Sequence, residues 1–159
     1  MDSAANRRIR VLTCDDSAFV RVALKQILEA GGMEVCGVAR NGREAVEKAY
    51  ALKPDLITMD VEMPEMDGVE ALRAIVAAGI APVIMLSSLT QKGAEKTLEA
   101  LEIGAFDCVG KPGGSRSLEQ DGRELVALIR KAVQYRVPPV RERDAAPVRA
   151  EGGRVPARQ

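Results

Sequence analysis

Short apolar runs recur along the chain, and four of them lead directly into a polar or charged residue. The run Leu56–Met59 shows no strict alternation of polar and apolar positions, which is typical of a parallel strand covered on both faces. The segments between the runs have the three- and four-residue apolar spacing of amphipathic helices. The predicted strands are Ile9–Cys14, Met33–Ala39, Leu56–Met59, Val83–Leu86 and Cys108–Gly110.

Five helices are predicted between and after these strands. Ser17 can cap the first helix, which runs to Ala30 and stops at the glycine pair that follows. The second predicted helix is Arg43–Leu52, and Pro54 ends it. The remaining three are Asp67 or Gly68 to Ala78, Gln91–Gly104 and Arg123–Gln134. The predicted core-facing positions of the last two are Ala94, Leu98, Leu101 and Ala105, and Leu125, Ile129 and Val133.

Strands that alternate with helices predict an α/β fold with a doubly wound, five-stranded parallel sheet and five helices. Right-handed crossovers favour the flavodoxin-like strand order 2-1-3-4-5. The first and third strands then lie side by side at the centre of the sheet. We therefore expect residues 1–135 to form one domain.

Polar groups collect where four of the predicted strands end. Asp15 and Asp16 follow the first strand, and Asp60, Ser87 and Lys111 follow the third, fourth and fifth. Carboxyl ends of parallel strands share one edge of the sheet, where ligands bind. Three carboxylates at such short distances disfavour one another's ionisation, and a divalent cation is needed to balance their charge. With a hydroxyl and an ammonium beside them, they indicate a phosphoryl-transfer site.

The composition excludes several other classes of protein. The 159 residues are 47% hydrophobic and 29% charged, with equal numbers of basic and acidic side chains, which does not favour nucleic-acid binding. No apolar run approaches the roughly 18 residues of a membrane helix, and no signal peptide is evident, so we expect a cytoplasmic protein. The absence of histidine rules out Ser-His-Asp and Cys-His catalysis.

Three cysteines, Cys14, Cys36 and Cys108, lie on predicted strands. We expect them to be buried, reduced thiols rather than metal ligands.

The chain changes character after Tyr135. Arg136–Gln159 contains four of the eight prolines and no Leu, Ile, Met or aromatic residue. Such a segment cannot bury enough apolar surface to offset its ordering entropy. We expect residues 136–159 to be a disordered linker that leads to a domain this chain does not contain.

Three motifs together resemble the receiver domain of two-component response regulators, over about residues 8–135. They are Asp15-Asp16-Ser17, the segment from Met59 to Gly68 (MDVEMPEMDG) and Lys111-Pro112. The segments Ala39–Gly42, Met85–Thr90, Gly93–Ala105 and Lys111–Ser115 are similar in particular to the receiver of the chemotaxis protein-glutamate methylesterase. In that family a linker leads from the receiver to a serine-hydrolase domain.

The resemblance implies a role for each candidate residue. Asp60 would take a phosphoryl group from a histidine kinase, and Lys111 and Ser87 would contact the phosphoryl oxygens. Asp16, Asp60 and the backbone carbonyl of Glu62 would hold Mg²⁺, with Asp15 acting mainly through a water. Phosphorylation would relieve inhibition of the missing catalytic domain, and chemoreceptors would be partners reached through the linker.

One position departs from the family's pattern. Receivers usually carry an aromatic switch residue three positions before the lysine, where this chain has Cys108, while Phe106 lies two residues earlier. A thiol is small for that role, which favours a signal that leaves through the loop after the fourth strand.

Two other function classes stay open on the sequence alone. The first is a receiver that serves another output domain or acts alone. The second is a small phosphohydrolase with an aspartate nucleophile, faintly suggested by Asp60-Val61-Glu62. Gly113-Gly114-Ser115 resembles half of a hydrolase nucleophile turn, but without a histidine it is expected to be a flexible loop.

Overall fold

The computed structural model describes residues 8–88, 90–112 and 118–134. Within these residues five strands alternate with five helices. The strands are β1 (Arg10–Cys14), β2 (Glu34–Ala39), β3 (Leu56–Asp60), β4 (Val83–Ser87) and β5 (Asp107–Gly110). The helices are α2 (Ala18–Ala30), α3 (Gly42–Leu52), α4 (Gly68–Ala78), α5 (Gln91–Ile103) and α6 (Leu118–Val133). The predicted linker, residues 136–159, and the loop Gly113–Ser115 lie outside the described residues.

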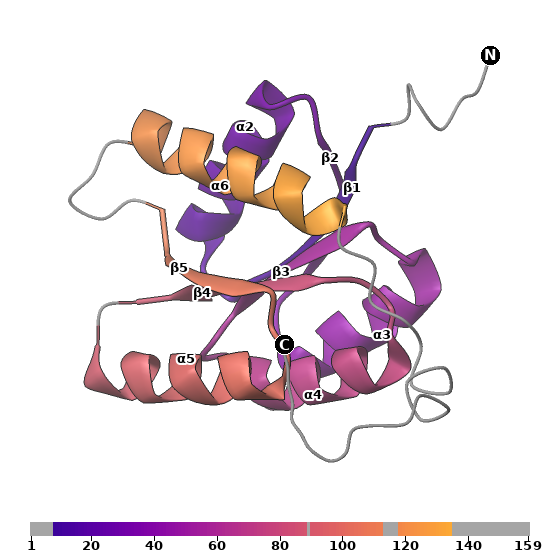
Figure 1. Ribbon diagram of the computed structural model, residues 1–159, viewed down its shortest axis with the longest axis vertical. Helices are drawn as coiled ribbons and strands as arrows, with labels where there is room; N and C mark the ends of the chain where they lie inside the picture. The colour runs from indigo at the N-terminus through magenta and orange to yellow at the C-terminus, as the bar shows by residue number, and fades with distance from the viewer. Residues whose placement is uncertain (1–7, 89, 113–117, 135–159) are drawn as a thin grey trace.

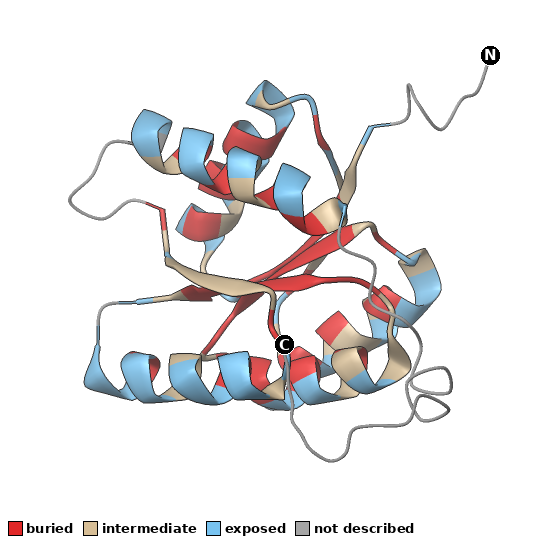
Figure 2. Ribbon diagram, viewed as in Figure 1, coloured by how far each residue is buried: buried red, intermediate tan, exposed pale blue. Residues whose placement is uncertain are grey.

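The strands form one parallel sheet in the order β2-β1-β3-β4-β5, which confirms the predicted topology. Helices α2 and α6 cover one face of the sheet, and α3, α4 and α5 cover the other (Figure 1). β3 lies at the centre with all five residues buried, and the inward sides of the helices are buried against the sheet (Figure 2). Each strand end agrees with its prediction to within one residue.

Two hydrophobic clusters fill the space on the two faces of the sheet. Leu12, Met59 and Met85 belong to the cluster under α3, α4 and α5. Leu24 and Ile129 belong to the cluster under α2 and α6. Because both faces are covered, polar atoms of the sheet find ligands only at its ends. No helix among the described residues is long and apolar enough to cross a membrane.

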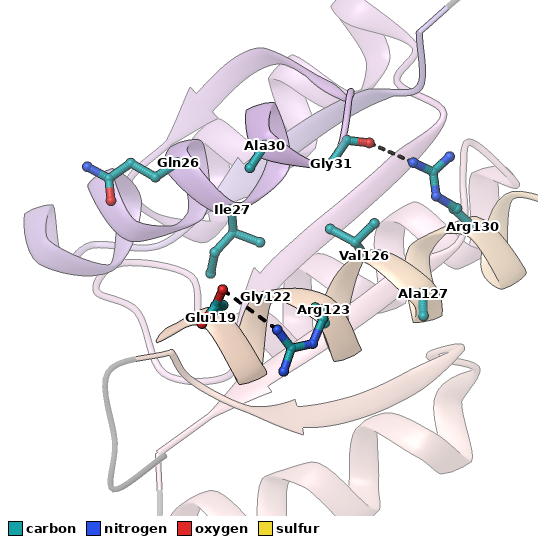
Figure 3. Close-up of a pocket in the computed structure, with 10 residues that line it drawn as sticks. All are labelled: Gln26, Ile27, Ala30, Gly31, Glu119, Gly122, Arg123, Val126, Ala127 and Arg130. Atoms are coloured by element: carbon teal, nitrogen blue, oxygen red, sulfur yellow. Dashed lines mark hydrogen bonds and ion pairs between the residues drawn. The ribbon is translucent and has the colours of Figure 1, made fainter. Parts of the chain in front are cut away.

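Helix α6 begins at Leu118, earlier than the predicted start at Arg123. The prediction was wrong because Gly122 is a poor helix former, yet here it lies inside the helix and packs on α2. A Cβ atom at Gly122 would lie 3.2 Å from Cγ1 of Ile27, so glycine permits the close approach of the two helices. Arg130 donates a hydrogen bond of 2.6 Å to the carbonyl of Gly31 at the end of α2 (Figure 3). The predicted core positions Leu125 and Ile129 are buried.

The predicted core face of α5 was wrong at three of its four positions. Ala105 is buried, but Ala94 is exposed, and Leu98 and Leu101 are 66% and 42% exposed. The helix instead buries Gly93 and Ala100, whose small size lets the backbone approach the sheet edge closely. Apolar spacing alone did not distinguish this small-residue face from the leucine face.

The cysteines carry free thiols, but only Cys14 is fully buried. Cys36 and Cys108 are half-buried, because they lie on the edge strands β2 and β5 rather than in the middle of the sheet.

The loop after β3 rests on the start of α3. Asn41 caps α3 by accepting a hydrogen bond of 2.9 Å from the amide of Glu44. The amide of Gly42 donates to the carbonyl of Met66 at 2.7 Å. A Cβ atom at Gly42 would lie 2.0 Å from that carbonyl oxygen. This glycine therefore lets two backbones meet where a side chain would separate them.

We predict that Gly42→Ala lowers the free energy of unfolding by about 1–3 kcal/mol, because a methyl group overpacks this backbone contact. Gly110→Ala is the control, since a Cβ atom there meets no atom within 4 Å. Urea unfolding of both variants measures the difference. Equal stability of Gly42→Ala and the wild type would contradict the prediction.

Candidate functional site

The register of the sheet brings Asp15 and Asp60 to neighbouring strand ends. Cys14, the last residue of β1, pairs with Met59 in β3. The residues that follow, Asp15 and Asp60, therefore stand side by side at the carboxyl edge. Both carboxylates are buried, with Asp15 fully inaccessible and Asp60 2% exposed.

Lys111 reaches this pair from the end of β5. Ser87 pairs with Gly110, and the amide of Lys111 donates to the carbonyl of Ser87 at 3.1 Å. The Lys111 ammonium nitrogen lies 3.0 Å from Oδ2 of Asp60 and 3.5 Å from Oδ2 of Asp15. One ammonium is thus shared by two buried carboxylates. The strand-end pattern predicted that these side chains meet at one edge of the sheet, but not that they share the ammonium.

Backbone amides hold one oxygen, Oδ1, of each of the two carboxylates. The amide of Ser17 donates to Oδ1 of Asp15 at 2.8 Å, and the amide of Glu62 donates to Oδ1 of Asp60 at 3.2 Å. Arg21 also donates to the backbone carbonyl of Asp15 at 3.1 Å. Each Oδ1 atom is therefore held by the turn that follows its strand, and each Oδ2 atom faces Lys111.

Burial is the largest influence on the pKa values of the clustered side chains. It raises the pKa of Asp60 to about 6, and the neighbouring charge of Asp15 adds to the effect, while the hydrogen bond from Lys111 opposes it. Burial also raises the pKa of Asp15. For Lys111 burial acts in the opposite direction, but the hydrogen bond to Asp60 and the charge of Asp15 outweigh it and raise its pKa. With a pKa of about 6, the Asp60 carboxylate is mostly ionised at neutral pH.

Asp16 completes a cluster that fits a hard divalent cation. Carboxylate oxygens of Asp15, Asp16 and Asp60 all lie within 4.8 Å of one another, and Asp16 is exposed to solvent. Apart from the Lys111 ammonium, the buried Oδ2 atoms of Asp15 and Asp60 have no hydrogen-bond partner among the described residues. Three carboxylates and one ammonium leave a net negative charge for a cation to balance. The fourth predicted ligand, the carbonyl of Glu62, belongs to the turn directly after Asp60.

Ser87 reaches the same edge of the sheet, but its hydroxyl is bonded elsewhere. It donates to the carbonyl of the next residue, Ser88, at 3.0 Å. Beside it lies a cavity of about 440 Å³ between β4, α5 and β5, lined in part by Cys108 and Leu98. Cys108 donates to the carbonyl of Thr97 at 3.8 Å, and burial raises the pKa of its thiol to about 12. This thiol is not poised for nucleophilic chemistry.

The pattern of strand ends did not identify a second ion pair near the site. Lys96 of α5 lies 2.5 Å from Oδ2 of Asp67, which also caps α4. Burial acts to raise the pKa of Asp67, but the hydrogen bonds from Lys96 and from the amide of Glu70 prevail and lower it. Asp67 before Gly68 is a recognisable capping signal, whereas nothing local marks Lys96 as its partner. The pair joins α5 to the end of the loop that follows Asp60.

A comparison with protein families shows that the family model of the response regulator receiver domain matches residues 11–132 of the chain. The chain belongs to this family. The receiver is 55% identical over 125 residues to a protein-glutamate methylesterase/protein-glutamine glutaminase of Archaeoglobus fulgidus, covering 78% of this chain and 36% of that protein. It is 53% identical over 131 residues to the protein of the same name from Thermotoga maritima, covering 80% and 38%. The chain thus spans little more than a third of these relatives.

Solved structures agree with this assignment. The receiver matches the crystal structure of the response regulator domain of Thermotoga maritima CheB with a TM-score of 0.72 and 52% identity, covering 81% of this chain and 98% of that one. It also matches a chain of the CheX-CheY-BeF3-Mg²⁺ complex from Borrelia burgdorferi, with a TM-score of 0.69, 28% identity and coverage of 82% and 93%. The receiver is therefore homologous to the regulatory domains of methylesterases of the CheB type.

The raised pKa of Asp60 predicts a pH-dependent stability in metal-free buffer. The folded receiver binds this proton more tightly than the unfolded chain does, so the free energy of unfolding falls as the pH rises from about 4 to above 6. Asp60→Asn removes this loss and should be about 2–3 kcal/mol more stable than the wild type at pH 8, and closer to it at pH 5.

Chemical unfolding at the two pH values, with EDTA present, measures this difference. Glu47→Gln, which removes an exposed carboxylate from α3, is the matched control and should show little of the effect. A wild type that is as stable as Asp60→Asn at pH 8 would contradict the prediction.

Proposed function

We propose that this receiver accepts a phosphoryl group on Asp60 and thereby regulates a methylesterase domain that lies beyond this chain. The observation that carries the proposal is the pair of buried carboxylates that share the Lys111 ammonium beside the exposed Asp16. A purely structural role does not account for this arrangement, because two buried carboxylates with one cation destabilise the fold.

The chemistry is a transfer of the phosphoryl group between two nucleophiles. An oxygen of the ionised Asp60 carboxylate attacks the phosphorus of a donor, such as the phosphohistidine of a histidine kinase. The bond from phosphorus to the donor nitrogen breaks as the bond to the Asp60 oxygen forms. Lys111, already 3.0 Å from the carboxylate, would move its charge to a phosphoryl oxygen, and Ser87 would donate its hydroxyl proton to another.

The same residues supply the ligands for Mg²⁺. Asp16, Asp60 and the carbonyl of Glu62 would bind the ion, with Asp15 contacting one of its waters. Mg²⁺ suits this set because it retains several waters and takes few carboxylates. The bound ion would offset the charge of the phosphoryl group, which adds roughly −1.5 to −2 to the site. The homologous Borrelia burgdorferi complex, which contains BeF3 and Mg²⁺, supports this assignment.

The relatives that carry this receiver suggest its output. Their name, protein-glutamate methylesterase/protein-glutamine glutaminase, describes proteins of which the receiver covers 36% and 38%. In our proposal, phosphorylation of Asp60 relieves inhibition of such a hydrolase domain, and chemoreceptors are reached through the linker. Such a system works in the cytoplasm.

Two observations separate this proposal from the alternatives. A coding sequence that continues beyond Gln159 into a hydrolase domain with a nucleophilic serine supports it, whereas a DNA-binding domain or a stop codon favours a different receiver. A phosphohydrolase with an aspartate nucleophile would turn over phosphomonoesters continuously, whereas the receiver should be labelled once and then lose the group slowly.

We predict that Asp60→Asn folds but is not phosphorylated, because an amide of nearly the same shape is a poor nucleophile. The measurement is the gain in mass of the intact chain after incubation with acetyl phosphate and Mg²⁺. Asp55→Asn, which changes an aspartate at the opposite end of β3, is the control and should be labelled like the wild type. Labelling of Asp60→Asn at the wild-type rate would make another residue the acceptor.

We also predict that Mg²⁺ raises the melting temperature of the wild type by mass action, because it binds only the folded cluster. Asp16→Asn should lose most of this rise, since Asp16 would be a direct ligand of the ion and is the exposed carboxylate of the cluster. Thermal unfolding with and without Mg²⁺ in large excess over the protein measures it. A full Mg²⁺ response in Asp16→Asn would remove this residue from the ligand set.

A further inference from the structure

The first turn of α5 lies directly against the hydroxyl of Ser87. A Cβ atom at Gly93 would lie 2.9 Å from Oγ of Ser87, 2.9 Å from the carbonyl oxygen of Ser88 and 3.0 Å from Oγ1 of Thr90. No side chain fits beside these three oxygens as they are placed. The Ser88 carbonyl belongs to the backbone, and Oγ1 of Thr90 is held by a hydrogen bond of 2.9 Å from the amide of Gly93. Of the three, the Ser87 hydroxyl therefore moves most readily, by turning about its single side-chain torsion.

The hydroxyl of Ser87 is engaged in this position. It donates its only proton to the carbonyl of Ser88 at 3.0 Å. A serine hydroxyl has one proton to donate, so this bond excludes a hydrogen bond to a phosphoryl oxygen on Asp60. The hydroxyl therefore has two mutually exclusive orientations, one beside Gly93 and one toward the phosphoacceptor.

We propose that Gly93 is a positioning residue that gives the Ser87 hydroxyl its place away from the phosphoacceptor, and so lowers the affinity of the site for a phosphoryl group. This inference rests on the proposed function, since it assigns Gly93 a part in the same reaction. Gly93 touches neither Asp60 nor Lys111 in any described contact, and its effect passes through Ser87.

The same turn connects Ser87 to the outer surface of the receiver. The hydroxyl of Thr97 donates to the carbonyl of Gly93 at 2.8 Å, and the carbonyl of Thr97 accepts from the Cys108 thiol. These hydrogen bonds would pass a movement of the turn around Gly93 on to α5 and β5. This route needs no aromatic side chain at position 108.

The test is the affinity of purified receiver variants for beryllofluoride, a phosphoryl mimic, in the presence of Mg²⁺. Gly93→Ala should bind it about fivefold more tightly than the wild type or better, because the methyl group displaces the Ser87 hydroxyl from its orientation beside residue 93. In a Ser87→Ala background the same substitution should change the affinity little. A double-mutant cycle isolates this dependence.

Gly122→Ala is the matched control, since it also places a methyl group at a tightly packed helical glycine, but in α6 against Ile27. It should leave the beryllofluoride affinity unchanged. An unchanged affinity in Gly93→Ala would overturn the inference. So would an equal gain with and without the Ser87 hydroxyl, because the methyl group would then act through Ser88 or Thr90.

A second measurement needs no substitution at Gly93. Beryllofluoride should shift the amide resonance of Gly93 in the wild type, and this shift should be lost in Ser87→Ala while the resonances around Asp60 still respond. The same Gly93 shift in both proteins would overturn the inference. If the wild type does not bind beryllofluoride at all, the proposed function fails as well, which separates the two failures.

Discussion

A single ammonium shared by two buried carboxylates is the interaction on which the rest of the site depends. Asp15 and Asp60 are almost inaccessible to water, and Lys111 lies within 3.5 Å of both. One lysine cannot compensate two buried negative charges, so the folded chain retains an electrostatic cost that raises the pKa of Asp60 to about 6. A cation at the carboxylates would relieve part of this cost, and it would also offset the negative charge that a phosphoryl group brings to the site.

The sheet supplies the rigidity that holds these charges together. Asp60 ends a strand buried along its whole length, and its carbonyl oxygen would lie 2.0 Å from a Cβ atom at Gly68, so α4 begins directly against it. Asp67 caps that helix and pairs with Lys96. The amide of Lys111 is tied to the carbonyl of Ser87. A displacement of Ser87 or Lys111 would therefore be shared by the ends of β4 and β5.

The sequence was sufficient for the parts of the molecule that depend on local signals. The alternation of strands and helices, with right-handed crossovers, predicted the strand order. Apolar runs that end in Asp15, Asp60 and Lys111 predicted the meeting of these side chains, because parallel strands share one edge. The predictions for most of the core face of α5 and for the first residue of α6 were wrong. Gly93 and Gly122 are placed by close packing against other elements, and helix propensity and apolar spacing carry no information about that packing. The pairing of Lys96 with Asp67 is also non-local, as no feature near either residue indicates it.

The size of the signal that Ser87 can carry follows from the partners of its hydroxyl. Its bond to the neutral carbonyl of Ser88 contributes about 1 kcal/mol, whereas a bond to a charged phosphoryl oxygen would contribute about 1.5–3 kcal/mol. Exchanging one for the other biases the loop by about 1 kcal/mol, or roughly fivefold in population. A buried aromatic side chain that moved at the same time would add its own transfer free energy, of about 1.5–3 kcal/mol. With Cys108 in that place the receiver lacks this addition, so in our proposal the response would rest on the Ser87 hydroxyl and on Lys111 instead.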